Sequence, residues 1–182
     1  PVDEGNNQEQ YVMNTITKSW CKFQGWEANC WESFGDNPYF GGNGVVGRAW
    51  DSTYADNGTD INTNVLQAFN YFEQRGVKKY FTRARPSIFT DGLPAIQVSM
   101  NIDYDTSDPT SALSYSPSSY GLWDVGIWDA SSWGQGLMIT NNFQGITGIG
   151  YCGGIHLKSA SQTLQLEWAA TDVVYQTGWA GI

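Results

Sequence analysis

The sequence predicts an all-β protein, and three observations support this prediction. Helical periodicity is nearly absent along the 182 residues. Short runs of Val, Ile, Thr, Tyr, Phe and Trp alternate with Gly, Asn and Asp, which is typical of strands joined by turns. The dipeptides Asn43-Gly44, Asn57-Gly58 and Asp91-Gly92 favour tight hairpins, because these residues adopt positive φ at little cost.

Residues 1–64 are expected to form a propeller-blade-like antiparallel β-meander. Its short strands are predicted at residues 10–16, 20–25, 30–34, 39–41 and 45–50. Strands of this length at spacings of about ten residues are typical of a propeller blade or a small meander. Since a single blade leaves its edges unpaired, this region is expected to be the end of a larger domain. The opening PVDEGNNQEQ has no Met and no signal-peptide pattern, which favours a processed piece of a longer protein.

Residues 65–182 are expected to form a β-sandwich domain with longer strands. These strands are predicted at residues 79–85, 95–104, 148–159, 163–168 and 172–176, with a Ser/Pro-rich surface loop at 106–120. The one helix candidate, residues 64–73, fits a strand equally well. In the segment 148–159, a period of two places Ile149, Tyr151, Ile155 and Leu157 on one side and His156 and Lys158 on the other.

Composition excludes several classes of protein. Nine Lys or Arg face eighteen Asp or Glu, a net charge of −9, which argues against binding nucleic acid by neutralising phosphates. An aromatic content of 15% with only 15% charged residues excludes disorder. The chain has no apolar stretch long enough for a membrane-spanning helix. Its three cysteines, Cys21, Cys30 and Cys152, form no disulfide framework and are expected to act as small hydrophobic residues.

No enzymatic activity and no cofactor are predicted. His156 is the only histidine, so a catalytic triad would have a single candidate base, and no G-x-S-x-G elbow or phosphate-binding loop accompanies it. We expect His156 to face solvent or a neighbouring subunit. No catalytic residue, cofactor-binding residue or metal ligand is therefore assigned.

Two acidic segments are candidate sites. Asp103 and Asp105 would share a face of a strand, but a glycosidase needs two carboxylates that flank a cleft. A hydrated strand end is the preferred interpretation. Cation binding remains an open alternative for two sets of residues. The first set is Asp103, Asp105 and Asp108, and the second is Asp56, Asn57, Asp60 and Asn62.

Basic residues are concentrated in one segment: Arg75, Lys78, Lys79, Arg83 and Arg85. On a strand, Lys79, Arg83 and Arg85 would share a face with Phe81. In an acidic chain such a face is expected to contact carboxylates of this or another subunit. The alternative is an edge strand that charge protects from aggregation.

The segment GLWDVGIWDASSWG, residues 121–134, places Trp123, Trp128 and Trp133 five residues apart. At this spacing the three indoles cannot share one face of a helix or a strand. A ribbon buried on both faces, as occurs between subunits, would accommodate them, and tryptophan is favoured in interfaces. A sugar-binding platform with Asp124 and Asp129 is the rival interpretation.

Several segments together resemble tailed-bacteriophage virion proteins. They are YVMNTITKSW at 11–20, CKFQGW at 21–26, YFGGNG at 39–44, AFNYF at 68–72, LWDVGIWD at 122–129 and AATDVVY at 169–175. The chain is similar to the C-terminal part of a tail-hub, nozzle or packaged-DNA-stabilising protein of short-tailed phages. The resemblance implies a β-propeller combined with β-sandwich elements, assembled as a ring around the DNA channel. It implies no catalytic residue.

The resulting prediction is a structural virion component. It would be made in the bacterial cytoplasm, form a homo-oligomeric ring with other tail proteins, and let DNA pass without sequence-specific binding or contact with a membrane. Trp123, Trp128, Trp133, Lys79, Arg83 and Arg85 are its candidate interface residues. The alternative is a carbohydrate- or receptor-binding β-sandwich module.

Overall fold

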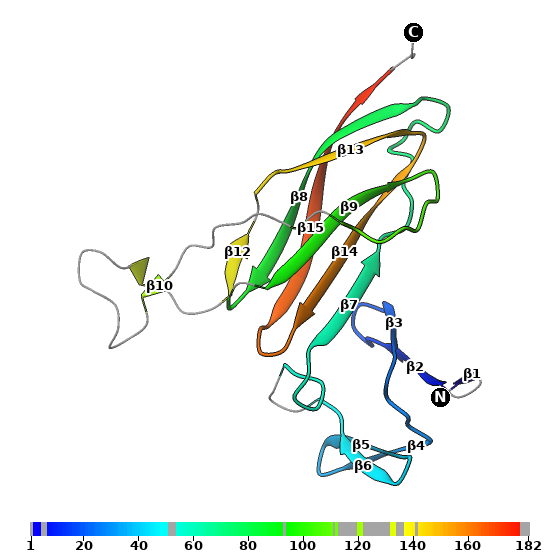
Figure 1. Cartoon of the computed structure of the whole chain (residues 1–182), viewed down its shortest axis with the longest axis vertical. Helices are drawn as coiled ribbons and strands as arrows, with labels where there is room; N and C mark the ends of the chain where they lie inside the picture. The colour runs from blue at the N-terminus through cyan, green and yellow to red at the C-terminus, as the bar shows by residue number, and fades with distance from the viewer. Residues whose placement is uncertain are drawn as a thin grey trace. The chain divides into compact units, whose positions relative to one another are not determined.

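The computed structural model describes residues 2–4, 7–50, 54–92, 94–110, 112, 120–121, 132–133, 137–140 and 142–178 (Figure 1). The protein is all-β: the described residues form several antiparallel sheets and no helix. The chain divides into two compact units, unit 1 from Pro1 to Thr53 and unit 2 from Tyr54 to Ile182.

Unit 1 contains two small antiparallel sheets. One consists of β1 (Val2–Glu4), β2 (Asn7–Met13) and β3 (Trp20–Phe23), and the other of β4 (Cys30–Phe34), β5 (Asn37–Gly42) and β6 (Val45–Arg48). The predicted turn at Asn43 and Gly44 joins β5 to β6, with φ of 50° and 75° at the two residues. These angles belong to the hairpin turns that match strand twist.

Aromatic rings form the interior of unit 1. Trp26 lies at the centre, with its ring centroid 5.1 Å from that of Phe23 and 5.3 Å from that of Phe40, on which it stacks. The rings of Trp31 and Trp50 also pack on Trp26. We call these five residues the aromatic cluster. None of its rings is fully buried, and Trp50 remains 57% exposed.

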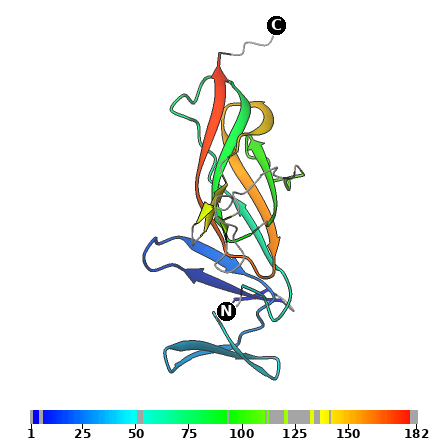
Figure 2. The ribbon, with the colours of Figure 1, turned by 90° about the vertical axis from the view of Figure 1, so that its left-hand side faces the viewer.

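Unit 2 contains two larger sheets. In the first, β8 (Lys79–Thr90) pairs along its length with β15 (Leu166–Thr177), and on its other side with β12 (Met138–Thr140) and β13 (Gln144–Gly150). The second has the order β7 (Ile61–Leu66), β14 (Gly153–Ser161), β9 (Ala95–Ile102). β15 runs alongside β8 in both ribbon views (Figures 1 and 2). A short parallel pair joins β10 (Tyr120–Gly121) to β11 (Ser132–Trp133).

Side chains from both sheets of unit 2 form one apolar core. Its buried members are Phe81, Ala84, Ile88, Ile96, Val98, Met100, Ile146, Ile155 and Leu157. They come from β8 and β13 in one sheet and from β9 and β14 in the other. Burying a side chain of this size stabilises a fold by about 1.5–3 kcal/mol, so this core is the main source of stability in unit 2.

The predicted face of β8 was wrong, because the strand contains a bulge. Thr82 and Arg83 lie between two core residues, Phe81 and Ala84, which are three positions apart and both fully buried. The pairing with β15 shifts at the same place, where Val174 is opposite Arg83 and Tyr175 is opposite Phe81. One extra residue reverses the alternation of side chains. Lys79 and Phe81 therefore point into the core, whereas Arg83 and Arg85 do not.

The predicted strand at residues 148–159 was also wrong. Two strands occupy this region, and the chain leaves the first sheet at Gly150 and enters the second at Gly153. Ile155 and Leu157 are in the core as expected, but Ile149 and Tyr151 are 49% and 41% exposed. Conversely, one strand, β15 (Leu166–Thr177), contains the expected strand at 172–176 and the last three residues of the one expected at 163–168.

The division into units lies closer to the N-terminus than the expected boundary at residue 64. β7 begins at Ile61 and pairs with β14 over six residues, from Ile61 opposite Ser161 to Leu66 opposite His156. The backbone hydrogen bonds of this ladder place residues 61–66 in unit 2.

Candidate functional site

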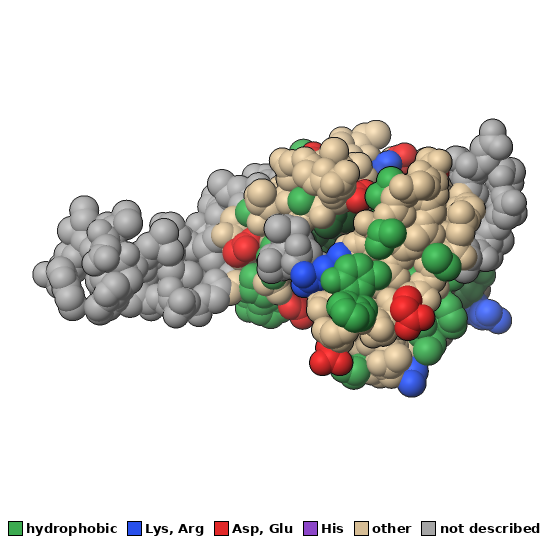
Figure 3. Space-filling model, turned by 90° about the horizontal axis from the view of Figure 1, so that it is seen from below, with side chains coloured by type: hydrophobic (Ala, Val, Ile, Leu, Met, Phe, Trp, Pro, Cys, Tyr) green, Lys and Arg blue, Asp and Glu red, His purple; other side chains and the backbone are tan. Residues whose placement is uncertain are grey.

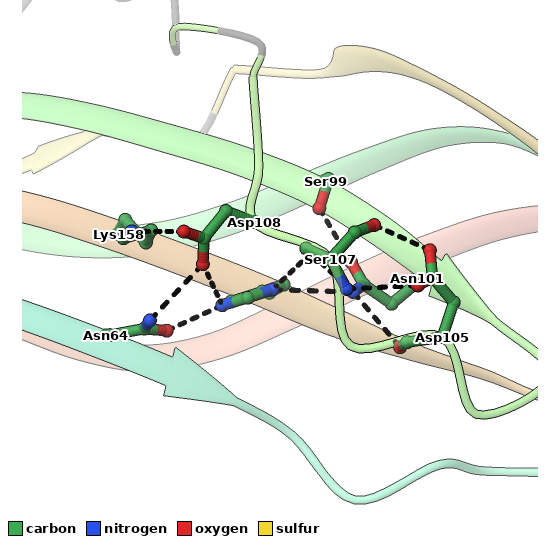
Figure 4. Close-up of polar contacts among 8 residues, drawn as sticks. Asn64, Ser99, Asn101, Asp105, Ser107, Asp108 and Lys158 are labelled. Carbon is green, nitrogen blue, oxygen red and sulfur yellow. Dashed lines mark hydrogen bonds and ion pairs between the residues drawn. The ribbon is translucent and has the colours of Figure 1, made fainter.

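A cluster of polar side chains in unit 2 surrounds His156, in the middle of β14. Ile155 and Leu157 point into the core, so His156 lies on the opposite face of the sheet, as the alternation predicts. It is nevertheless only 3% exposed. Residues 103–110, which follow β9, run across this face and cover the ring (Figure 4). The expectation that His156 faces solvent was therefore wrong.

Both nitrogens of the His156 ring contact oxygen atoms. Nδ1 lies 3.0 Å from the backbone carbonyl oxygen of Ser107. Nε2 lies 2.5 Å from Oδ1 of Asn64 on β7 and 4.0 Å from Oδ1 of Asp108. The sole histidine thus links its own strand to a neighbouring strand and to the segment that covers it.

Asp108 connects this segment to β14 at a second point. Its Oδ2 accepts a hydrogen bond of 2.7 Å from Nζ of Lys158, and its Oδ1 accepts one of 3.4 Å from Nδ2 of Asn64. The hydrogen bond from Lys158 holds the pKa of Asp108 below its ordinary value. The carboxylate, which is exposed to water, is therefore ionised at neutral pH.

Asn101, at the end of β9, holds the segment from the other side. Its side chain is 3% exposed, and its Nδ2 donates to the backbone carbonyl oxygens of Asp105 and Ser107 at 3.1 and 2.8 Å. Asp105 in turn accepts hydrogen bonds from the hydroxyl and the backbone N–H of Ser107, and the hydroxyl bond is the main reason why the pKa of Asp105 is lowered.

The aspartates that suggested a cation site do not converge. Asp103 lies just after the end of β9, with φ of 48°, and its Oδ1 accepts hydrogen bonds from the backbone N–H groups of Tyr151 and Cys152. Asp105 and Asp108 have the separate partners described above. Asp56 belongs to a tight turn, in which its backbone pairs with that of Thr59. Among the described residues, no group of three or more His, Cys, Asp or Glu side chains could hold a metal ion.

Lys79 is a buried structural residue and has no exposed surface. Its ammonium group donates to three backbone carbonyl oxygens, those of Gln74, Val77 and Tyr151, at 2.5, 3.0 and 3.1 Å. Three acceptors use all three donors of a lysine. The predicted basic face therefore loses Lys79, which instead joins the loop before β8 to the turn between β13 and β14.

The two arginines of that predicted face differ from each other. Arg85 donates through Nε and Nη2 to Oδ2 of Asp172, which lies opposite it on β15, at 2.9 and 2.6 Å. Its guanidinium also lies 4.8 Å from the centre of the Phe143 ring. Arg83 is exposed. The carboxylate partner expected for this segment is thus present within the same chain, at Asp172.

The predicted tryptophan interface lies almost wholly outside the described residues. Trp123 and Trp128 fall outside them, and for Trp133 only its place in β11 is described. The interface role of these three residues stays a prediction, as does that of Arg83 and Arg85.

Sequence reasoning missed Asn64 and Asn101 as members of the polar cluster around His156. The two residues are 92 and 55 positions away from it in the chain, and neither lies in a recognisable motif. An asparagine within an apolar strand pattern was the one available signal, since a polar residue in such a position needs a hydrogen-bond partner. That signal does not say which partner.

Comparison with known proteins adds no family: no family model matches this chain, and neither characterised proteins nor solved structures give a match. Within the part of the chain that the structure describes, no helix has the length and apolar character needed to cross a membrane. The class of protein that the geometry defines is accordingly an all-β protein with one well-packed unit and one aromatic, partly exposed unit.

Proposed function

We propose that this protein is a structural component of a larger assembly and acts by binding protein partners through unit 1. The observation that carries the proposal is the amount of apolar surface that unit 1 leaves in water. Its exposed large hydrophobic residues are Tyr11, Met13, Ile16, Trp20, Phe34, Val45, Val46 and Trp50. Ala28 and Ala49 are the only buried hydrophobic residues among those described in this unit.

Exposure of this kind favours a protein partner. Single exposed hydrophobic residues are ordinary, but many of them within one small unit are typical of interaction sites. Covering them would contribute about 25 cal/mol for each Å² removed from water. Figure 3 shows hydrophobic side chains at the surface of the protein beside Asp, Glu, Lys and Arg. Aliphatic members such as Ile16 and Val46 would add little to a sugar platform.

The assembly that we propose is a bacteriophage tail. The segments that resemble short-tailed-phage hub or nozzle proteins come from both units, and an acidic protein with net charge −9 suits a conduit to which DNA must not adhere. In this proposal the two sheets of unit 2 form a β-sandwich, and unit 1 is a propeller-blade-like meander of a larger domain. Copies of the chain form a ring within the virion and contact other tail proteins, and the chain has no catalytic role.

Light scattering coupled to size-exclusion chromatography tests the proposal over a range of protein concentrations. We expect an oligomer whose dissociation constant rises about tenfold or more in Val46→Ser, because burying an exposed valine on assembly is worth about 1.5 kcal/mol or more and about 1.4 kcal/mol is a factor of ten. Val65→Ser on β7 of unit 2 is the matched control and should leave the dissociation constant unchanged. Val46 and Val65 are 78% and 38% exposed.

A chain that stays monomeric at every concentration contradicts the ring. Binding to a glycan array that is lost in Trp123→Ala or Trp128→Ala contradicts the structural role and supports the alternative, a carbohydrate- or receptor-binding module.

A further inference from the structure

We propose that His156 is an imidazolium in the folded protein and that residues 103–110 form a clasp that releases as pH rises. The term clasp refers to this segment together with its contacts to His156 and Lys158 on β14, Asn64 on β7 and Asn101 on β9 (Figure 4). The proposal rests on the donors and acceptors around the ring and does not depend on the proposed function.

The Nδ1 atom of His156 must carry a hydrogen. Its near neighbours are the carbonyl oxygen of Ser107 at 3.0 Å and Nδ2 of Asn101 at 3.4 Å. The amide nitrogen of Asn101 has two hydrogens, and both are used, by the carbonyl oxygens of Asp105 and Ser107. No hydrogen is left to donate to Nδ1. The ring must therefore donate to Ser107, whose oxygen has a lone pair for each of its two donors.

The Nε2 atom must carry a hydrogen as well. It faces Oδ1 of Asn64 at 2.5 Å, and the amide nitrogen of Asn64 faces Oδ1 of Asp108 at 3.4 Å. Exchanging the oxygen and nitrogen of Asn64 would give Nε2 a donor, but it would place the amide oxygen against the carboxylate of Asp108. Two acceptors in contact repel each other, so the orientation shown is the favourable one. With both nitrogens protonated, the ring carries a positive charge.

The charges around the ring favour this state. The segment contributes the carboxylate of Asp108, whose Oδ1 lies 4.0 Å from Nε2, and the carboxylate of Asp105, which accepts hydrogen bonds from Ser107. Lys158, on the same strand as His156, opposes the imidazolium, but its ammonium group is bound to Asp108 at 2.7 Å. From β7 and β9 the cluster receives the uncharged side chains of Asn64, Asn101 and Ser99.

The clasp therefore has an upper limit in pH. A histidine ordinarily releases its proton near neutrality. Once Nε2 of His156 has lost its hydrogen, a lone pair faces the oxygen of Asn64, and the attraction to Asp108 disappears. Residues 103–110 are then held by fewer contacts. Toward acid, protonation of Asp108 removes the same attraction, so the clasp is strongest between these two limits.

Nitrogen NMR of protein labelled with ¹⁵N-histidine tests the charge state directly, because His156 is the only histidine in the chain. We expect both ring nitrogens to resonate as protonated nitrogens at about pH 6.5, where half of an ordinary histidine is neutral. A ring that shows one unprotonated nitrogen at this pH overturns the proposal.

Hydrogen exchange, corrected for the intrinsic effect of pH, tests the clasp. We expect the protection of residues 103–110 to fall severalfold from about pH 6 to about pH 9, and this dependence to vanish in His156→Gln. In Asp108→Asn, the midpoint should move to lower pH by a few tenths of a unit. Asp172→Asn, which removes a comparable ion pair on the other sheet, should leave the midpoint in place. The same midpoint shift in both aspartate variants overturns the proposal even if His156→Gln fails to fold.

Discussion

Units 1 and 2 contain the same kinds of apolar residue but bury their side chains to different extents. In unit 2, two sheets with strands of up to 12 residues enclose an aliphatic and aromatic core. In unit 1, strands of three to seven residues carry rings that are only half-buried. Short strands cannot cover wide side chains on both sides, and a chain of about 50 residues buries a smaller share of its surface.

This difference indicates that the core of unit 2 supplies stability, whereas unit 1 carries the proposed interaction surface. Unit 2 encloses an apolar core between its two sheets, although side chains such as Ile149 and Tyr151 remain 49% and 41% exposed. Unit 1 leaves Trp20, Phe34 and Val46 at 67%, 76% and 78% exposure, which suits a surface completed by partners. Three substitutions test this contrast, in order of decreasing effect.

Phe81→Ala should produce the largest effect. The ring has no exposed surface and packs against those of Phe72 and Tyr175, with centroids 5.4 and 5.9 Å apart. Removing a buried phenylalanine costs about 3–5 kcal/mol. Urea unfolding, monitored by hydrogen exchange in peptides from each unit, should show this loss of unfolding free energy in unit 2.

Phe34→Ala, at a residue that is 76% exposed, is the control in unit 1 and should cost no more than about 0.5 kcal/mol. Equal losses for the two phenylalanines would remove the contrast between the units.

Gly47→Ala tests how tightly the aromatic cluster of unit 1 is packed. A Cβ at this position would lie 2.4 Å from the tip of the Phe40 ring, which stacks on Trp26 at an interplanar angle of 8°. The ring must move, and overpacking of this kind costs about 1–3 kcal/mol. Near-ultraviolet circular dichroism should report a disturbed aromatic cluster together with lower stability.

Gly145→Ala is the matched control, because nothing lies within 4 Å of a Cβ built on this strand residue of unit 2. Its spectrum should remain that of the parent protein. An unchanged spectrum in Gly47→Ala would show that the cluster is too loosely packed to act as the interior of unit 1.

Glu9→Gln should have the smallest effect, confined to acid pH. Nζ of Lys22 donates to Oε1 of Glu9 at 2.7 Å, and this bond lowers the pKa of Glu9 from its ordinary value of 4.5. A lowered pKa stabilises the fold above the ordinary value, and this contribution is lost as pH falls through the lowered one. In Glu9→Gln, the stability of unit 1 should therefore depend less on pH below about 4.5, as followed by hydrogen exchange.

Glu32→Gln, at an exposed carboxylate on β4, should retain the acid sensitivity of the parent protein. An identical acid profile for the parent and Glu9→Gln would show that the bond to Lys22 contributes nothing to unit 1.

Local patterns predicted most strand positions. Cys30–Phe34 was predicted with its observed bounds, and β5, β6 and β9 were predicted to within two residues of their observed bounds. Turn chemistry also held at Asn43 and Gly44. Side-chain volume, alternation and preference for positive φ are properties of neighbouring residues, so a single sequence displays them.

Tertiary structure decided which way the side chains point and what they contact. The bulge at Thr82 and Arg83 depends on the register of β8 against β15, and it separates Arg83 and Arg85 from Lys79, which lies in the interior. The place of His156 depends on Asn64, 92 residues away. Composition and local patterns alone were enough to predict an acidic, all-β chain that is rich in aromatic residues. The sheets and the segment over His156 were decided by contacts between distant parts of the chain, whose free energies no local pattern encodes.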